Sequence, residues 1–281
     1  MERVDEAYAI RRYQQAAALL PLRWQRLCRQ VPEEQQAEAE ELRLRTGQTL
    51  TLLLRGGEVP AARERPYPVV TQTELEQLCD GVTDYSRYTL SRGYLTARGG
   101  FRIGVCGTAG LRDGVNTNLR DISSVTIRIA REQPGLSTEV LPQLFREGSF
   151  CSTLLLAPPG LGKTTLLRDL IRAVSDGEGG PALRVGVADE RGELAAMYQG
   201  EPQFSIGRQT DVLDGCPKGP ALLMLLRGMN PQVLAADEIT APEDAAALEM
   251  AANCGVSLLC TAHAGSLEEL KARPLYRRLL D

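Results

Sequence analysis

The chain has 281 residues, of which 43% are hydrophobic and 24% are charged, and its formal net charge is −4. This composition excludes a largely disordered chain, is sufficient for two domains, and argues against nucleic acid as a partner. No apolar run approaches the roughly 18 residues of a membrane span, and residues 1–6 lack the apolar region of a signal peptide. The seven cysteines contain no C-x-x-C pair, which favours a reducing, cytoplasmic compartment.

Residues 1–134 mix helical and strand patterns. Amphipathic patterns predict helices over residues 1–40 and 73–82, the second with Thr71 or Thr73 as its cap. Alternating patterns and glycine turns predict strands at 42–45, 50–54, 94–96, 102–105 and 127–129. The glycines between 99 and 110 are interpreted as strand and turn positions, not as a phosphate loop. With Gln133-Pro134-Gly135 as the linker, we predict a smaller α+β N-terminal domain over residues 1–134.

Apolar strands and helices alternate over residues 135–281. The predicted strands are 153–156, 184–188, 233–236 and 256–260, and the predicted helices are 164–174, 221–229 and 243–252. The stretch from the second strand to Asp214-Gly215 is predicted to be a long polar connection. Apolar strands separated by helices are typical of a parallel sheet covered on both faces. The second domain, 135–281, is therefore expected to be an α/β nucleotide-binding domain.

A glycine-rich turn joins the first of these strands to the first helix. Its sequence is close to the P-loop pattern G-x-x-x-x-G-K-[ST], with Ala157 in place of the first glycine. Backbone N–H groups at such a turn, with the positive end of the helix dipole, bind phosphate. A chance Gly-Lys-Thr turn is the alternative, but it would not explain the strand before and the helix after it. The expected ATP-binding residues are Pro158, Pro159, Gly160, Leu161, Gly162, Lys163, Thr164 and Thr165.

Hydrolysis of a triphosphate also needs an acid near Mg²⁺ and a group that activates water. The strand at 233–236 is followed by Asp237 and Glu238. We expect Asp237 and the hydroxyl of Thr164 to hold Mg²⁺, and Glu238 to polarise the attacking water. A surface acidic turn is the alternative. Asp189-Glu190 ends the preceding strand in the same way, so Glu190 is a rival for the water-activating role.

The only histidine, His263, follows the last predicted strand, where a polar group can sense the γ-phosphate. We favour this sensor role over a structural one, and over a catalytic base because carboxylates already fill that place. An arginine from a neighbouring subunit would complete the site. The candidates, among which the sequence does not choose, are Arg128, Arg131, Arg208 and Arg227.

Several motifs, spread over about residues 42–280, closely resemble the stage III sporulation protein AA family. The most specific is the block Thr210-Asp211-Val212-Leu213-Asp214-Gly215-Cys216-Pro217-Lys218, which generic P-loop proteins lack. The others are Asp189–Leu194, Gly93–Thr96, Gly99–Gly104 and Arg120–Glu132. Many members have glycine and serine where this chain has Ala157 and Gly228. Relatives usually continue beyond the position of Asp281, so we expect a short or truncated form.

The resemblance implies a RecA-like P-loop ATPase related to the motors of type II/IV secretion and pilus systems. It also implies a hexameric homo-oligomer on the mother-cell side of a membrane-embedded channel between mother cell and forespore. Secretion motors carry a Thr-Ala-His segment that resembles residues 261–263, which supports the sensor interpretation of His263. They also carry an arginine-bearing segment before the ATPase core, at a place comparable to that of Arg128 and Arg131.

We therefore predict an ATP-hydrolysing motor or assembly ATPase of the sporulation channel. A nucleotide-gated structural component of the channel, with negligible turnover, is the alternative. A P-loop protein that acts on nucleic acid would need a basic face with aromatic side chains, whereas only 5% of this chain is aromatic.

Overall fold

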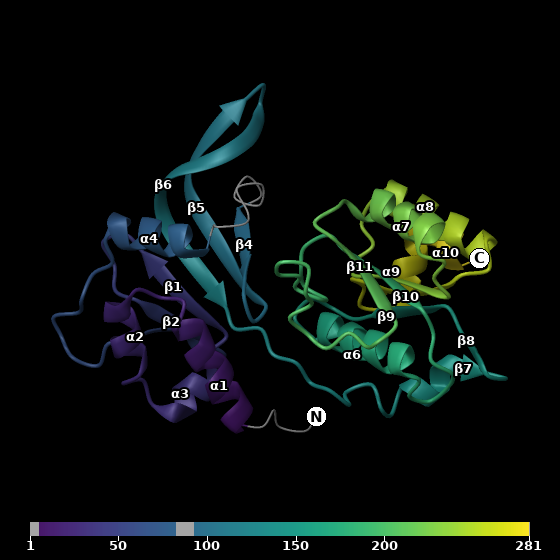
Figure 1. Ribbon diagram of the computed structural model, residues 1–281, viewed down its shortest axis with the longest axis horizontal. Coiled ribbons are helices and arrows are strands. Elements are labelled where there is room, and N and C mark those ends of the chain that lie inside the picture. The colour runs from purple at the N-terminus through teal and green to yellow at the C-terminus, as the bar shows by residue number, and fades with distance from the viewer. Residues whose placement is uncertain (1–5, 83–92, 281) are drawn as a thin grey trace. The chain divides into compact units, whose positions relative to one another are not determined.

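The structure is a computed structural model that describes residues 6–82 and 93–280 (Figure 1). The chain forms two compact units. Unit 1 comprises residues 1–131 and 198–200, and unit 2 comprises residues 132–197 and 201–281. The predicted linker, Gln133–Gly135, directly follows the point at which the chain first passes from unit 1 to unit 2. Within the described ranges, no helix is both long enough and apolar enough to cross a membrane.

Unit 1 contains a six-stranded sheet in the order β3-β2-β1-β6-β5-β4, with every neighbouring pair antiparallel. Thr71 and Glu74 form a reciprocal capping box at the start of helix α4 (Gln72–Val82), which agrees with the first of the two predicted caps. The strands are β1 (Glu41–Arg45), β2 (Thr51–Leu54), β3 (Gly57–Pro60), β4 (Tyr94–Ala97), β5 (Phe101–Arg112) and β6 (Val115–Arg128). The helices are α1 (Glu6–Ala17), α2 (Leu22–Cys28), α3 (Glu33–Glu38) and α4 (Gln72–Val82).

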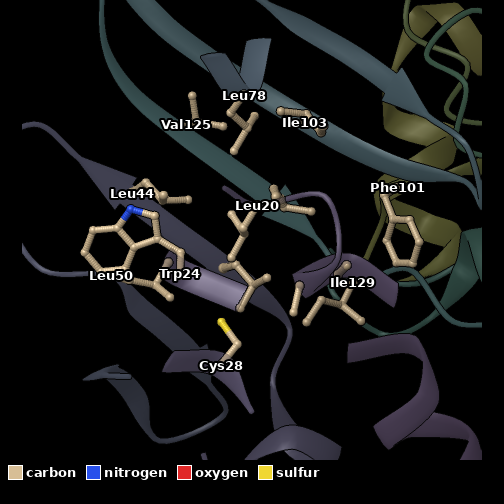
Figure 2. Packing of buried hydrophobic residues seen from close by; sticks show 14 of the residues in the cluster. Leu20, Trp24, Cys28, Leu44, Leu50, Leu78, Phe101, Ile103, Val125 and Ile129 are labelled. Carbon is tan, nitrogen blue, oxygen red and sulfur yellow. The ribbon is translucent and has the colours of Figure 1, made fainter. Parts of the chain in front are cut away.

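The core of unit 1 lies between this sheet and its helices, as Figure 2 shows for part of the cluster. Trp24 of α2 is completely buried and lies near Leu44 and Leu50. Alternate residues of β5, such as Phe101 and Ile103, contribute to the same cluster because side chains along a strand point to opposite faces. Unit 1 therefore has a hydrophobic core of its own.

Unit 2 contains a five-stranded sheet in the order β11-β10-β12-β13-β9, and all of its strand pairs are parallel. Its strands are β9 (Thr153–Leu156), β10 (Val185–Asp189), β11 (Thr210–Asp214), β12 (Val233–Ala236) and β13 (Ser257–Ala262). Its α-helices are α6 (Lys163–Asp176), α7 (Lys218–Gly228), α8 (Pro242–Asn253), α9 (Leu267–Ala272) and α10 (Pro274–Leu280). A small hairpin, β7 (Phe145–Arg146) and β8 (Ser149–Phe150), and a 3-10 turn, η2 (Leu141–Leu144), precede the sheet.

Helices cover both faces of this parallel sheet. Val233 and Ala235 of β12 belong to one hydrophobic cluster, together with the buried residues of α6. Leu234 and Ala236 belong to a second cluster, together with α7 and α8. Figure 1 shows α6 and the α7–α8 pair on opposite sides of the sheet. The predicted two-sided α/β arrangement is confirmed.

Two of the differences from the sequence-based expectation concern the positions of strands. Residues 210–214, predicted as the end of a long polar connection, form the edge strand β11, which pairs with β10 along its whole length. An edge strand is covered less completely than a central one, and the half-buried residues of β11 accordingly include Asp211. In unit 1, the predicted strand 127–129 is only the end of β6, which begins at Val115.

Candidate functional site

The phosphate loop connects β9 to α6. Gly160 and Gly162 have φ angles of 79° and 81°, a left-handed conformation that favours glycine. Lys163 begins α6, and its Nζ atom donates hydrogen bonds to the carbonyl oxygens of Ala157 (2.7 Å) and Pro158 (2.8 Å). The loop therefore holds a buried ammonium group beside the free N–H groups of a helix start, an arrangement that suits a phosphate ligand.

The order of the sheet brings the phosphate loop close to Asp237. Strand β13 lies between β9 and β12, so the carboxyl ends of these three parallel strands meet at one edge. Asp237, directly after β12, accepts a hydrogen bond from the hydroxyl of Thr164 on α6 (Oγ1–Oδ2, 2.6 Å). Its other carboxylate oxygen accepts from the hydroxyl of Thr261 in β13. Asp237 therefore links the start of α6 to β13.

The pair Thr164–Asp237 suits Mg²⁺, because Mg²⁺ prefers oxygen ligands and usually binds through one or two protein oxygens together with substrate phosphates. In the described part of the chain, no group of three or more His, Cys, Asp or Glu side chains is arranged to hold a metal ion. The residues present fit a metal ion that arrives with a nucleotide.

Glu238 lies between two basic side chains. Its Oε1 is 2.7 Å from Nε2 of His263, and its Oε2 accepts a hydrogen bond from Nη1 of Arg191 at 2.9 Å. Burial raises the pKa of the Glu238 carboxyl, but the hydrogen bond from His263 and the nearby positive charges outweigh it, so the pKa is lowered overall. Nδ1 of His263 is buried and has no hydrogen-bond partner among the described residues. Glu238 and His263 thus form one unit at the edge of the sheet.

Asp189 and Glu190, at the end of β10, have different surroundings. The carboxylate of Asp189 accepts hydrogen bonds from the backbone N–H groups of Glu193, Leu194 and Ala195, so it shapes the loop after β10. Glu190 forms an ion pair with Lys218 (Oε2–Nζ, 3.1 Å), whose side chain is only 5% exposed. Glu190, Lys218 and Glu238 all line the same small cavity.

The four arginine candidates lie in different surroundings. In unit 1, Arg128 forms an ion pair with Glu41, and Arg131 donates to the carbonyl oxygens of Ala37 and Ala39. Burial lowers the pKa of Arg131. In unit 2, Arg208 is highly exposed and pairs with Asp176, whereas Arg227 is exposed in the last turn of α7.

Three residues at this edge were not assigned a role from the sequence: Arg191, Lys218 and Thr261. Arg191 and Lys218 belong to the blocks 189–194 and 210–218 that carry the family resemblance, which was the signal available for them. Thr261 lies two residues before His263, and only the order of the strands reveals that its side chain meets Asp237.

Comparisons with known proteins agree on family and fold. A family model described as "Sporulation stage III, protein AA" matches residues 10–281. The chain is 38% identical over 270 residues to stage III sporulation protein AA of Bacillus subtilis (strain 168). The matched region covers 94% of this chain and 86% of that protein.

Two solved structures show the same fold. The ATPase DotB of Legionella pneumophila has a TM-score of 0.53 and 15% identity, over 99% of this chain and 71% of DotB. The pilus retraction motor PilT, solved with bound ADP, has a TM-score of 0.54 and 16% identity, over 85% of this chain and 69% of PilT. At such identities the likeness concerns the fold alone, which is RecA-like as predicted.

Proposed function

Because the chain belongs to the stage III sporulation protein AA family, we propose that it is an ATP-hydrolysing motor of the channel between mother cell and forespore. The observation that carries this proposal is the hydrogen-bonded set Thr164–Asp237–Thr261 beside Glu238. It brings a hydroxyl of the phosphate loop, a metal-side carboxylate and a second, separate carboxylate to one edge of the sheet. Phosphoryl transfer to water requires these three kinds of group together.

In this mechanism the phosphate loop binds ATP through its backbone N–H groups, and Lys163 exchanges its carbonyl partners for the β- and γ-phosphate oxygens. Thr164 and Asp237 would hold Mg²⁺, which neutralises charge on the phosphates. Glu238 orients the attacking water and accepts its proton. His263, in contact with Glu238, reports the state of the γ-phosphate to the end of β13.

Glu238 fits the water-activating role better than Glu190 does. Glu238 follows the same strand as Asp237. The hydroxyl of Thr261 contacts both residues, because it accepts a hydrogen bond from the backbone N–H of Glu238 and donates one to Asp237. Glu190 follows β10, which is one strand farther from the phosphate loop than β12, and it forms an ion pair with the buried Lys218. We assign the role to Glu238 and a supporting electrostatic role to Glu190.

The assembly proposed is a cytoplasmic ring of six copies on the mother-cell side, docked on membrane-embedded channel proteins. The family relation and the RecA-like fold support it. Nucleotide would lie between subunits, and a neighbour would supply an arginine to the γ-phosphate. The candidates remain Arg128, Arg131, Arg208 and Arg227.

One observation favours a second function, a nucleotide-gated structural component with negligible turnover. Both carboxylate oxygens of Glu238 are engaged by basic side chains, Arg191 and His263. Although burial raises the pKa of the Glu238 carboxyl, these contacts favour its ionised form and lower the pKa overall, which makes the carboxylate a weaker base toward water.

Phosphate release from ATP at increasing protein concentrations separates the two functions, with the Lys163→Ala variant as the blank. Specific activity that rises with concentration is expected for sites completed between subunits. Activity at the level of the blank, with ATP still bound by the unmodified chain, would refute the motor and support the structural component.

A further inference from the structure

Thr261 occupies a central place at the edge of the sheet in unit 2. It is the second-last residue of β13, the strand between β9 and β12, and it is completely buried. It belongs to the hydrogen-bonded set that supports the proposed ATPase, but it neither holds the metal nor activates water there.

Thr261 contacts three consecutive residues after β12. Its hydroxyl donates a hydrogen bond to Oδ1 of Asp237 and accepts one from the backbone N–H of Glu238 at 2.8 Å. Its carbonyl oxygen accepts a hydrogen bond from the N–H of Ile239 at 3.1 Å. A threonine hydroxyl has a single proton, and here that proton is used on Asp237.

The turn that Thr261 holds has an uncommon conformation. Glu238 has a φ angle of 50°, in the left-handed region that residues other than glycine rarely adopt. Such a conformation persists when the surrounding structure determines it at several points. The contacts from Thr261 supply such points, on both sides of Glu238 and at its own N–H group.

We propose that Thr261 is a positioning residue that joins the metal-side carboxylate to the water-activating one. Through one hydroxyl it orients the carboxylate of Asp237 toward Thr164, and it holds the backbone from which the Glu238 side chain projects. Because both carboxylates depend on the same hydroxyl, they move together. This inference rests on the proposed function, since it gives Asp237 and Glu238 the roles assigned there.

Two substitutions isolate the hydroxyl. Thr261→Ser and Thr261→Ala both remove the methyl group, so they differ from each other by a single oxygen. Thr261→Val keeps the size of the side chain without the hydroxyl and serves if the alanine variant does not fold, as judged by circular dichroism. Thr210→Ala is the matched control. Thr210 lies in β11, at the far edge of the same sheet, and its hydroxyl donates a hydrogen bond to the carbonyl oxygen of Ile206.

The first readout is binding of a non-hydrolysable ATP analogue at increasing Mg²⁺ concentration, and the second is kcat for ATP. Loss of a residue that orients a metal ligand typically costs about 10–100-fold in metal affinity or activity. We expect Thr261→Ala to raise the Mg²⁺ concentration for half-maximal binding and to lower kcat by such factors. Affinity for the analogue without Mg²⁺ should not change, and Thr261→Ser and Thr210→Ala should resemble the unmodified chain.

The inference is overturned if serine and alanine at position 261 are equally impaired, since the hydroxyl would then be irrelevant. It is also overturned if the alanine variant behaves like the unmodified chain, or if the unmodified chain binds the analogue without any dependence on Mg²⁺. Absence of ATP turnover in the unmodified chain would instead contradict the proposed function. In that case the Mg²⁺ titration of analogue binding still decides the role of Thr261.

Discussion

Replacement of each of the two candidate carboxylates by glutamine tests which one activates water. In Glu238→Gln the side chain keeps its size, and its amide oxygen can still accept a hydrogen bond from Arg191 or His263. In Glu190→Gln the same chemical change removes the negative partner of Lys218, whose side chain is 5% exposed. The two variants therefore differ in what they disturb.

The expected magnitudes follow from these surroundings. A positioned general base contributes about 10²–10⁴-fold to the rate, so Glu238→Gln should lower kcat by that factor. Its stability should change little, because Glu238 is partly exposed and remains hydrogen-bonded. Glu190→Gln weakens a charge-assisted contact to a buried lysine, which costs about 2 kcal/mol. For a domain of this size this corresponds to a fall in melting temperature of about 4–8 °C.

Single-turnover hydrolysis of ATP, binding of a fluorescent ATP analogue and thermal unfolding measure these effects. We expect Glu238→Gln to bind the analogue with unchanged affinity and to retain uncleaved ATP, and Glu190→Gln to hydrolyse ATP at a temperature well below its melting point. The opposite pattern, with an active Glu238→Gln and an inactive but stable Glu190→Gln, would refute the assignment and transfer the role to Glu190.

Three further outcomes are expected. Lys163→Ala should abolish binding of ATP analogues, because the lysine supplies the charge on the β- and γ-phosphates; unchanged binding in an equilibrium assay would contradict the phosphate-loop assignment. Asp169→Asn should lower the free energy of unfolding by about 2–4 kcal/mol, because the buried carboxylate accepts three hydrogen bonds from Gly135 and Ser137. Burial raises the pKa of Asp169, but the hydrogen bonds lower it overall from its ordinary value of 3.8, so its contribution is present above that pH and is lost as the pH falls through the lowered pKa. Denaturant titrations from pH 7 to pH 3 should show a larger loss of stability in the unmodified chain than in the variant, which lacks the Asp169 contribution. Trp24→Ala should cost about 3–5 kcal/mol in the same titrations at pH 7 and leave affinity for ATP analogues unchanged, since Trp24 belongs to the core of unit 1.

The phosphate loop and the parallel sheet could be predicted from sequence because their signals are local. A short apolar run, glycines at two positions of positive φ, and a lysine at a helix start lie within a dozen residues of one another. Strands β10 and β12 are buried along their whole length, and β9 and β13 are also largely apolar, which gives continuous runs that are easily recognised.

Other features escaped prediction because their cause is tertiary. The edge strand β11 carries polar residues that resemble a loop, and only its pairing with β10 makes it a strand. Likewise, Arg191, Glu238 and His263 follow three different strands, and no spacing in the sequence indicates that their side chains meet. The sequence could place each residue at one edge of the sheet, but it could not give their contacts.

The order of the strands explains why residues at the end of β13 are central to the site. Because β13 separates β9 from β12, the ends of those two strands are two strand spacings apart, about 9–10 Å. The hydroxyl of Thr164, at the start of α6, and the carboxylate of Asp237, after β12, form a hydrogen bond across that gap. A polar side chain at the end of β13 lies in the gap, where Thr261 contacts Asp237 and Glu238; an apolar side chain would leave Oδ1 of Asp237 and the N–H of Glu238 without this hydroxyl. Substitutions at Thr261 and His263 should therefore change metal-dependent binding and hydrolysis together, and substitutions in the phosphate loop should change binding first.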